Sequence, residues 1–107
     1  MDGSELALID KYFGKIVEYI VYKFGYNIDL EEEYDELLQF IYKRIVKVWF
    51  DGKPPSLDDL EAKLKSMRRK RSKLEVVLSY LISIYAKRNG TIYLKKYGDR
   101  YDERYYW

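Results

Sequence analysis

The sequence contains no cysteine and no histidine. Without cysteine the chain forms no disulfide and no thiolate metal site. Without histidine it has no imidazole ligand for zinc and no Ser-His-Asp triad. Only carboxylate, lysine and tyrosine chemistry stays open, so we expect a protein that is not an enzyme and that holds no metal and no cofactor.

Long apolar runs are also missing. The longest nearly apolar stretch, Val76 to Ala86, contains two serines and is too short to cross a bilayer. No basic start is followed by an apolar run, so we expect no signal peptide. These absences predict a cytoplasmic protein without a membrane partner.

Glutamine is nearly absent, with one residue, whereas tyrosine is abundant, with thirteen. One glutamine, no cysteine and dense Lys, Glu and Arg are typical of hyperthermophile proteins. This composition indicates a thermophilic archaeon, or one of its viruses, as the source.

The two halves of the chain differ in charge. Residues 1–52 carry six Lys/Arg and eleven Asp/Glu, a balance of −5, whereas residues 53–107 carry fourteen Lys/Arg and seven Asp/Glu, a balance of +7. Such asymmetry is expected when one half faces a polyanion. The alternative interpretation is two differently solvated surfaces.

At 107 residues we expect one domain with a single modest core. Its N-terminal helix is predicted from about Ser4 to Phe24, with Gly25 as a left-handed stop. Apolar residues recur along it at steps of three and four, and tyrosines extend the apolar surface to a second side. A helix that is apolar on two sides needs two packing partners, so we expect one side to face a second copy of the chain or another protein. The predicted interface residues are Leu6, Ile9, Tyr12, Phe13, Ile16, Tyr19 and Ile20.

Two further helices are predicted before the basic run of residues 67–71. The first begins after Asp29 and ends at residues 51–53, just before two prolines. The second opens at Ser56, which forms an approximate capping box with Asp59.

A fourth helix is predicted from Ser72 to Asn89, with Ser72 and Glu75 as a second capping box. After Gly90 the apolar spacing changes from helical to alternating, which predicts a two-stranded hairpin over residues 91–107. We therefore expect a mostly α fold with a small C-terminal β-hairpin.

This order of elements resembles the winged helix-turn-helix superfamily over about residues 31–107. In that resemblance, Ser56 to Leu64 corresponds to the positioning helix, Ser72 to Asn89 to the recognition helix and Thr91 to Trp107 to the wing. The resemblance implies a single domain, 1–107, in which an additional N-terminal packing and dimerisation segment, 1–28, precedes a winged helix-turn-helix, 29–107. Two features depart from the pattern: the turn between the two helices is long and basic, and the predicted recognition helix is unusually apolar.

The basic run lies where one predicted helix ends and the next begins, which is where a helix-turn-helix meets the phosphates beside the major groove. Each cation that neutralises a phosphate releases a counterion, which makes the affinity sensitive to salt. The outward face of the fourth helix is expected to reach the bases, although serine and valine read bases weakly. Cations near the hairpin tip are expected to touch the DNA backbone or the minor groove. The predicted nucleic-acid-binding residues are Arg68, Arg69, Lys70, Arg71, Ser72, Lys73, Val76, Ser79, Tyr80, Ser83, Lys87, Lys95, Lys96 and Arg100.

These observations predict a protein that binds duplex DNA, a transcriptional regulator that dimerises through its first helix. One alternative is a small non-catalytic subunit of a replication, transcription or nucleic-acid-processing complex that uses the winged fold to hold a protein. A binder of RNA or single-stranded nucleic acid is another alternative. The simplest interpretation of the basic run is a solvated face without a ligand.

Overall fold

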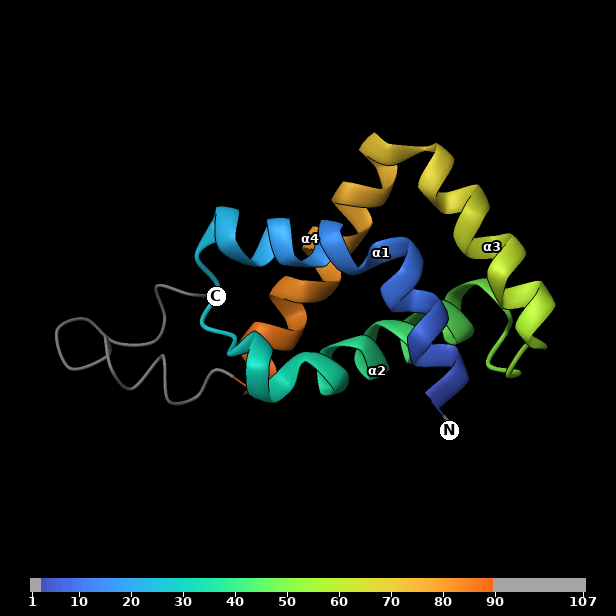
Figure 1. Cartoon of the computed structure of the whole chain (residues 1–107), viewed down its shortest axis with the longest axis horizontal. Helices are drawn as coiled ribbons and strands as arrows, with labels where there is room; N and C mark the ends of the chain where they lie inside the picture. Colours follow the sequence, from blue (N-terminus) through green and yellow to red (C-terminus); the bar gives the residue numbers. More distant parts are fainter. Residues whose placement is uncertain (1–2, 90–107) are drawn as a thin grey trace, which may run out of the picture.

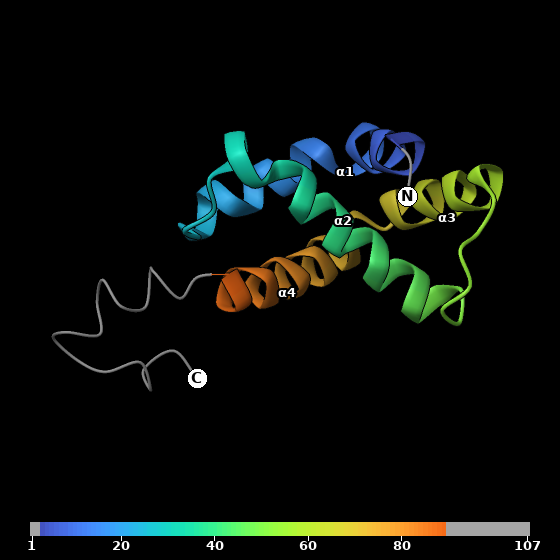
Figure 2. The same cartoon turned by 90° about the horizontal axis from the view of Figure 1, so that it is seen from below.

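The computed structural model describes residues 3–89, which form four α-helices (Figure 1). The helices are α1 (Gly3–Phe24), α2 (Leu30–Trp49), α3 (Leu57–Arg69) and α4 (Arg71–Asn89). A view from a second direction shows α2 lying across α1 and α4 (Figure 2), and α2 contacts both of these helices.

The helix ends follow local signals in the sequence. Asp29 caps α2 by accepting a hydrogen bond from the backbone nitrogen of Glu31 at 3.0 Å, and Ser56 caps α3 in the same way from Asp59 at 3.1 Å. Gly25 follows α1 with a φ of 65°, a left-handed conformation that glycine adopts without steric cost. The predicted starts of α2 and α3 and the predicted end of α1 are therefore confirmed.

Two helices, α1 and α4, lie at the centre of the fold, because each contacts the other three helices. The core joins side chains from every helix, among them Phe13, Leu37, Leu64 and Leu78, each 0% exposed. Burying a side chain of this size stabilises the fold by about 1.5–3 kcal/mol. The core therefore depends on α1 as much as on the helices that follow it.

Much of the apolar surface of α1 that was expected to face a second chain packs within the chain itself. The other three helices contact α1 and bury most of its apolar residues, but Tyr22, 74% exposed, and Phe24, 53% exposed, stay uncovered. Tyr19, 47% exposed, is the only exposed member of the predicted dimer interface. The other six members are buried in the core of the chain or pack against it: Leu6, Ile9, Tyr12, Phe13, Ile16 and Ile20.

The predicted fold class is wrong. Residues 3–89 contain no strand, and every buried core residue of this range lies between Ile9 and Tyr85. Four helices thus close the core without a sheet, whereas a winged helix-turn-helix packs strands against its helices. α1 is also central to the fold and is not an addition to it. The predicted hairpin or wing, residues 91–107, lies outside the described residues.

Candidate nucleic-acid interface

The basic run is helical and does not form a long turn. α3 continues to Arg69, Lys70 alone separates the two helices, and α4 begins at Arg71. The carbonyl oxygen of Lys70 accepts a hydrogen bond from the backbone nitrogen of Leu74 at 2.9 Å, which starts α4 before Ser72. The predicted capping box at Ser72 is therefore wrong.

Glu75 has a different partner from the one the capping box implied. Its Oε2 accepts a hydrogen bond from Nε of Arg71 at 3.0 Å, across one turn of α4. Such a pair of exposed side chains stabilises a helix by only about 0.2–0.5 kcal/mol. The pair also leaves one guanidinium at the start of α4 partly neutralised.

The cations of the run divide between two surfaces, and Lys70, which lies between the two helices, is on a different surface from its neighbours. Arg68 and Arg71 line an open hollow of about 780 Å³ together with Lys11 and Lys15 of α1. Arg68 also lines a neighbouring depression, so the exposed basic side chains continue from one hollow to the other. We call the exposed basic side chains that line the two hollows the basic face. Its members are Lys11, Lys15, Lys65, Arg68, Arg69 and Arg71.

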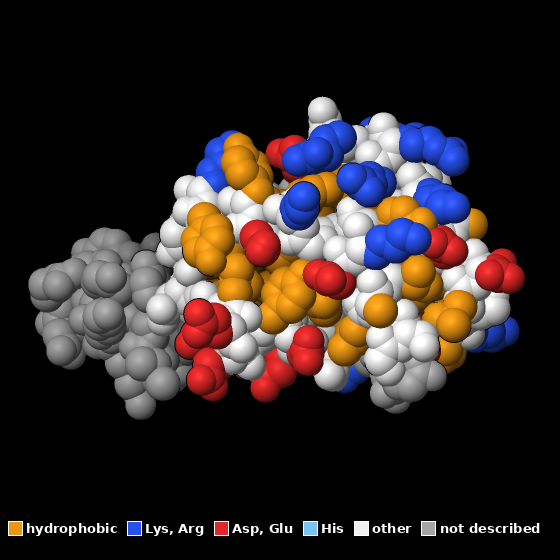
Figure 3. Space-filling view, viewed as in Figure 1, with side chains coloured by type: hydrophobic (Ala, Val, Ile, Leu, Met, Phe, Trp, Pro, Cys, Tyr) orange, Lys and Arg blue, Asp and Glu red, His pale blue; other side chains and the backbone are white. Residues whose placement is uncertain are grey.

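Figure 3 shows Lys and Arg side chains gathered over the upper part of the molecule, where α1, α3 and α4 meet. A group of Asp and Glu side chains lies below them, over the start of α2. Folding thus brings cations from the acidic half of the sequence beside those of the basic half. Within residues 3–89, Lys15, Arg68 and Arg69 form no ion pair.

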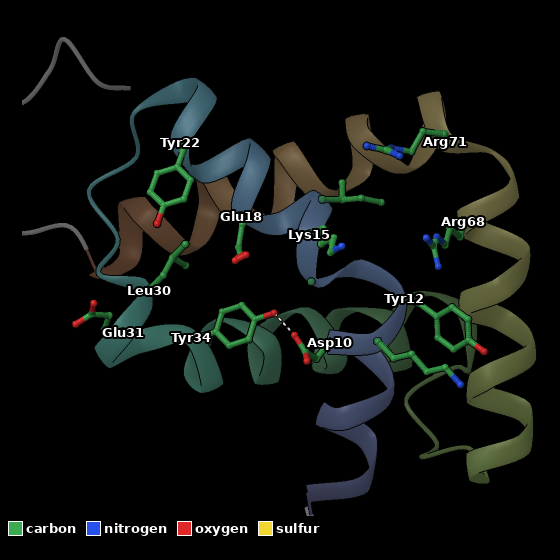
Figure 4. A pocket seen from close by; sticks show the side chains of 13 residues that line it. Asp10, Tyr12, Lys15, Glu18, Tyr22, Leu30, Glu31, Tyr34, Arg68 and Arg71 are labelled. Carbon is green, nitrogen blue, oxygen red and sulfur yellow. Dashed lines mark hydrogen bonds between the residues drawn. The ribbon is translucent and has the colours of Figure 1, made fainter.

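The opposite side of the hollow is acidic (Figure 4). The Tyr34 hydroxyl donates a hydrogen bond to Oδ1 of Asp10, and Glu18 and Glu31 lie on the same side. Burial, followed by this hydrogen bond and the nearby carboxylates, raises the pKa of Tyr34 well above its usual value of 10.0. Tyr34 therefore stays a neutral donor, and the carboxylates limit how far a polyanion can extend from the basic face.

Gly14 makes room for this pair in the middle of α1. A Cβ atom at Gly14 would lie 2.6 Å from Oδ1 of Asp10 and 2.8 Å from the Tyr34 hydroxyl. Both distances are shorter than real Cβ contacts allow, so an alanine there would push the pair apart. The glycine lowers helix propensity but permits the link between α1 and α2.

A second carboxylate, besides Glu75, lies within reach of the basic face itself. Glu61 of α3 accepts a hydrogen bond from the Tyr12 hydroxyl at 2.6 Å, and Nζ of Lys11 lies 3.6 Å from the same oxygen. The hydrogen bond from Tyr12, aided by the charges of Lys11 and Lys65, lowers the pKa of Glu61 below 4.5. Glu61 is thus anionic at neutral pH and competes with any ligand for Lys11.

The remaining predicted binding residues lie apart from the basic face. Lys70 and Lys73 line a hollow of about 190 Å³ on another surface, together with Lys63. Val76 and Tyr80 are exposed beside α2 and line a further hollow there.

Three serines and four further cations complete the predicted set. Ser72 is exposed, Ser79 and Ser83 are half-buried, and Oγ of Ser83 donates to the carbonyl oxygen of Tyr80 at 2.7 Å. Lys87 is exposed near the end of α4. Lys95, Lys96 and Arg100 lie outside the described residues.

Three cations of the basic face were missed in the sequence analysis: Lys11, Lys15 and Lys65. Lys11 and Lys15 are four residues apart and Lys65 precedes Arg68 by three, so each pair shares one side of its helix. This spacing was visible in the sequence. What the sequence does not reveal is that α1 packs against α3 and brings the two sides together.

No known family model matches the chain, and no curated protein or solved structure shows significant similarity to it.

Features of the described part of the chain also bear on other kinds of site. None of its helices combines the length and the apolar composition of a membrane-spanning segment. Residues 3–89 also contain no group of three acidic side chains placed to hold a metal ion.

Proposed function

We propose that the protein binds duplex DNA through the basic face and that phosphate contacts supply most of the affinity. The observation that carries this proposal is the gathering of six exposed cations from α1, α3 and α4 around one hollow and the depression beside it. Cations gathered from several elements attract a polyanion more strongly than the same charges spread over the surface. The attraction is strongest on the side of the hollow away from Asp10, Glu18 and Glu31.

The contacts in this proposal carry little sequence information. Phosphate contacts position a protein on DNA, whereas base edges in the grooves specify the sequence. Val76 and Tyr80, two of the five side chains predicted to reach base edges, line a hollow that shares no residue with the basic face. We therefore expect similar affinities for duplexes of unrelated sequence.

The test is a titration of a fluorescent duplex with the chain at several salt concentrations. The logarithm of the affinity should fall linearly with the logarithm of salt concentration, with a slope of up to about −5 if all six cations meet phosphates, at about −0.9 per phosphate. Lys15→Ala should weaken binding and make the slope shallower by about one unit.

The matched control is Lys43→Ala, which removes an exposed cation of α2 outside the basic face and should change neither quantity. A slope near zero, or equal losses for the two variants, would contradict the proposal. A clear preference for single-stranded over duplex ligand of the same length would assign the face to unpaired nucleic acid instead.

A further inference from the structure

A second surface of the molecule, between α2 and α4, exposes large apolar side chains. Val48 is 60%, Val76 70% and Tyr80 64% exposed, although each lies on a helix whose other sides build the core. Two adjoining hollows of about 190 and 320 Å³ share Trp49 and Val77, so the apolar surface is continuous. We call Val48, Trp49, Val76, Val77 and Tyr80 the α2–α4 groove.

The cations that line these hollows have no acidic neighbours in them. They are Arg44, Lys63, Lys70 and Lys73, and neither hollow is lined by a carboxylate. Nζ of Lys63 lies 5.4 Å from the centre of the Trp49 ring, so one cation already covers part of the apolar floor. The groove thus combines an apolar floor with a rim of one charge sign.

We infer that the α2–α4 groove binds an amphipathic helix of a partner protein, one with apolar side chains along one face and Asp or Glu on both sides of it. A groove between two helices accepts the apolar face of a third, with anchors at i, i+3, i+4 and i+7. Carboxylates beside those anchors meet the rim cations, whereas basic flanks are repelled. A nucleic acid would satisfy the cations and leave Val48 and Val76 without apolar partners.

This inference is independent of DNA binding. It gives a physical site to a non-catalytic subunit that holds another protein. The basic face and the α2–α4 groove share no residue, so substitutions can address each surface separately.

The experiment uses two synthetic helical peptides of about four turns with the same leucine spacing, one with glutamate flanks and one with lysine flanks. Each is labelled and titrated with the full chain, and binding is followed by fluorescence anisotropy. The glutamate peptide should bind and the lysine peptide should not. Tyr80→Ala should weaken binding of the glutamate peptide about tenfold, as loss of an aromatic anchor does.

Variants of the rim and of the other surface complete the design. Lys73→Glu should weaken binding of the glutamate peptide by about threefold or more, because a rim charge is reversed. Tyr22→Ala removes an aromatic ring that is 74% exposed and lies outside the groove, so it should leave peptide binding unchanged. Lys15→Ala should also leave it unchanged, even if DNA binding is lost.

Four results would overturn the inference. The first is equal binding of both peptides, and the second is no binding of either. The third is a loss of affinity for the glutamate peptide in Tyr22→Ala as large as that in Tyr80→Ala. The fourth is a dimer of the chain, measured by sedimentation, that Tyr80→Ala dissociates, because it would assign the groove to a second copy.

Discussion

The basic face and the α2–α4 groove are both lined by cations, but different neighbours surround those cations. On the basic face the guanidinium and ammonium groups border a hollow whose far side is acidic. In the α2–α4 groove the cations frame exposed valine, tyrosine and tryptophan. A cation beside polar groups suits phosphate, whereas a cation beside an apolar floor suits a carboxylate carried on an apolar helix. The class of ligand thus depends on the neighbours of a charge as well as on the charge.

One short run of sequence supplies both surfaces. Arg68, Arg69 and Arg71 contribute to the basic face, while Lys70 contributes to the groove, followed by Lys73. Lys70 lies in the break between α3 and α4, and Lys73 lies two residues, or about 200°, beyond Arg71 around α4. A charge run in a helical segment therefore cannot be assigned to one ligand from its composition alone.

The largest expected effect separates these two sets of cations. Arg68→Ala, Arg69→Ala and Arg71→Ala together should lower the affinity for duplex DNA by about two to three orders of magnitude near 0.1 M salt, because three released counterions are lost. Lys70→Ala with Lys73→Ala should cost less than about tenfold, although it also removes charge from the same run. Direct titration of both variants with one duplex measures the two losses of affinity. Equal losses would mean that DNA contacts both sets of cations alike.

A second expectation contrasts the inner and outer sides of α4. Leu78→Ala should lower the free energy of unfolding by about 2–5 kcal/mol, because Leu78 is 0% exposed in the core. Tyr80→Ala, two residues along, should change it by less than about 0.5 kcal/mol, because its ring is largely in solvent. Urea unfolding of both variants measures the difference. A large loss for Tyr80→Ala would make its ring part of the fold and not of a binding surface.

The third expectation concerns the acidic side of the hollow. The pKa of Tyr34 is raised in the folded chain, mainly by burial and then by Asp10, so the unfolded chain releases this proton more readily. The stabilisation that Tyr34 contributes is complete below about pH 10 and is lost as the pH rises toward the folded pKa. Urea midpoints at pH 8 and pH 11 should therefore differ less for Tyr34→Phe than for the wild type. Tyr22→Phe, an exposed control, should keep the wild-type difference.

The sequence predicted the helices well because their signals are local. Asp29 and Ser56 cap the helices they were expected to cap, and Gly25 ends α1 in the left-handed conformation. The capping box at Ser72 was wrong, because α4 already begins at Arg71, with Lys70 as the single residue between the two helices. The turn at Lys70, and not the capping motif at Ser72, therefore sets the start of α4, and the sequence pattern does not show which of the two signals prevails.

The fold class and the candidate site were predicted less well because they depend on packing between distant segments. The apolar second side of α1 was assigned to another chain, whereas part of it, including Val17 and Val21, is buried within this one. The same packing brings Lys11 and Lys15 beside Arg68, which no pattern within one helix reveals. The −5 to +7 charge split suggested that the N-terminal half stays away from a polyanion, yet α1 supplies two members of the basic face.

The smallest expected effect tests Glu61, one of the two carboxylates that form ion pairs with cations of the basic face. Glu61 is anionic at neutral pH and lies 3.6 Å from Lys11, so it offsets one positive charge where phosphates are proposed to bind. Glu61→Gln should raise the affinity for duplex DNA about two- to threefold, consistent with the small energy of an exposed ion pair. Asp51→Asn removes an exposed carboxylate beyond the end of α2 and should leave the affinity unchanged, although it lowers the total negative charge equally. Equal gains in affinity for both variants would mean that the affinity depends only on the net charge of the protein. The basic face would then not be the surface that binds DNA.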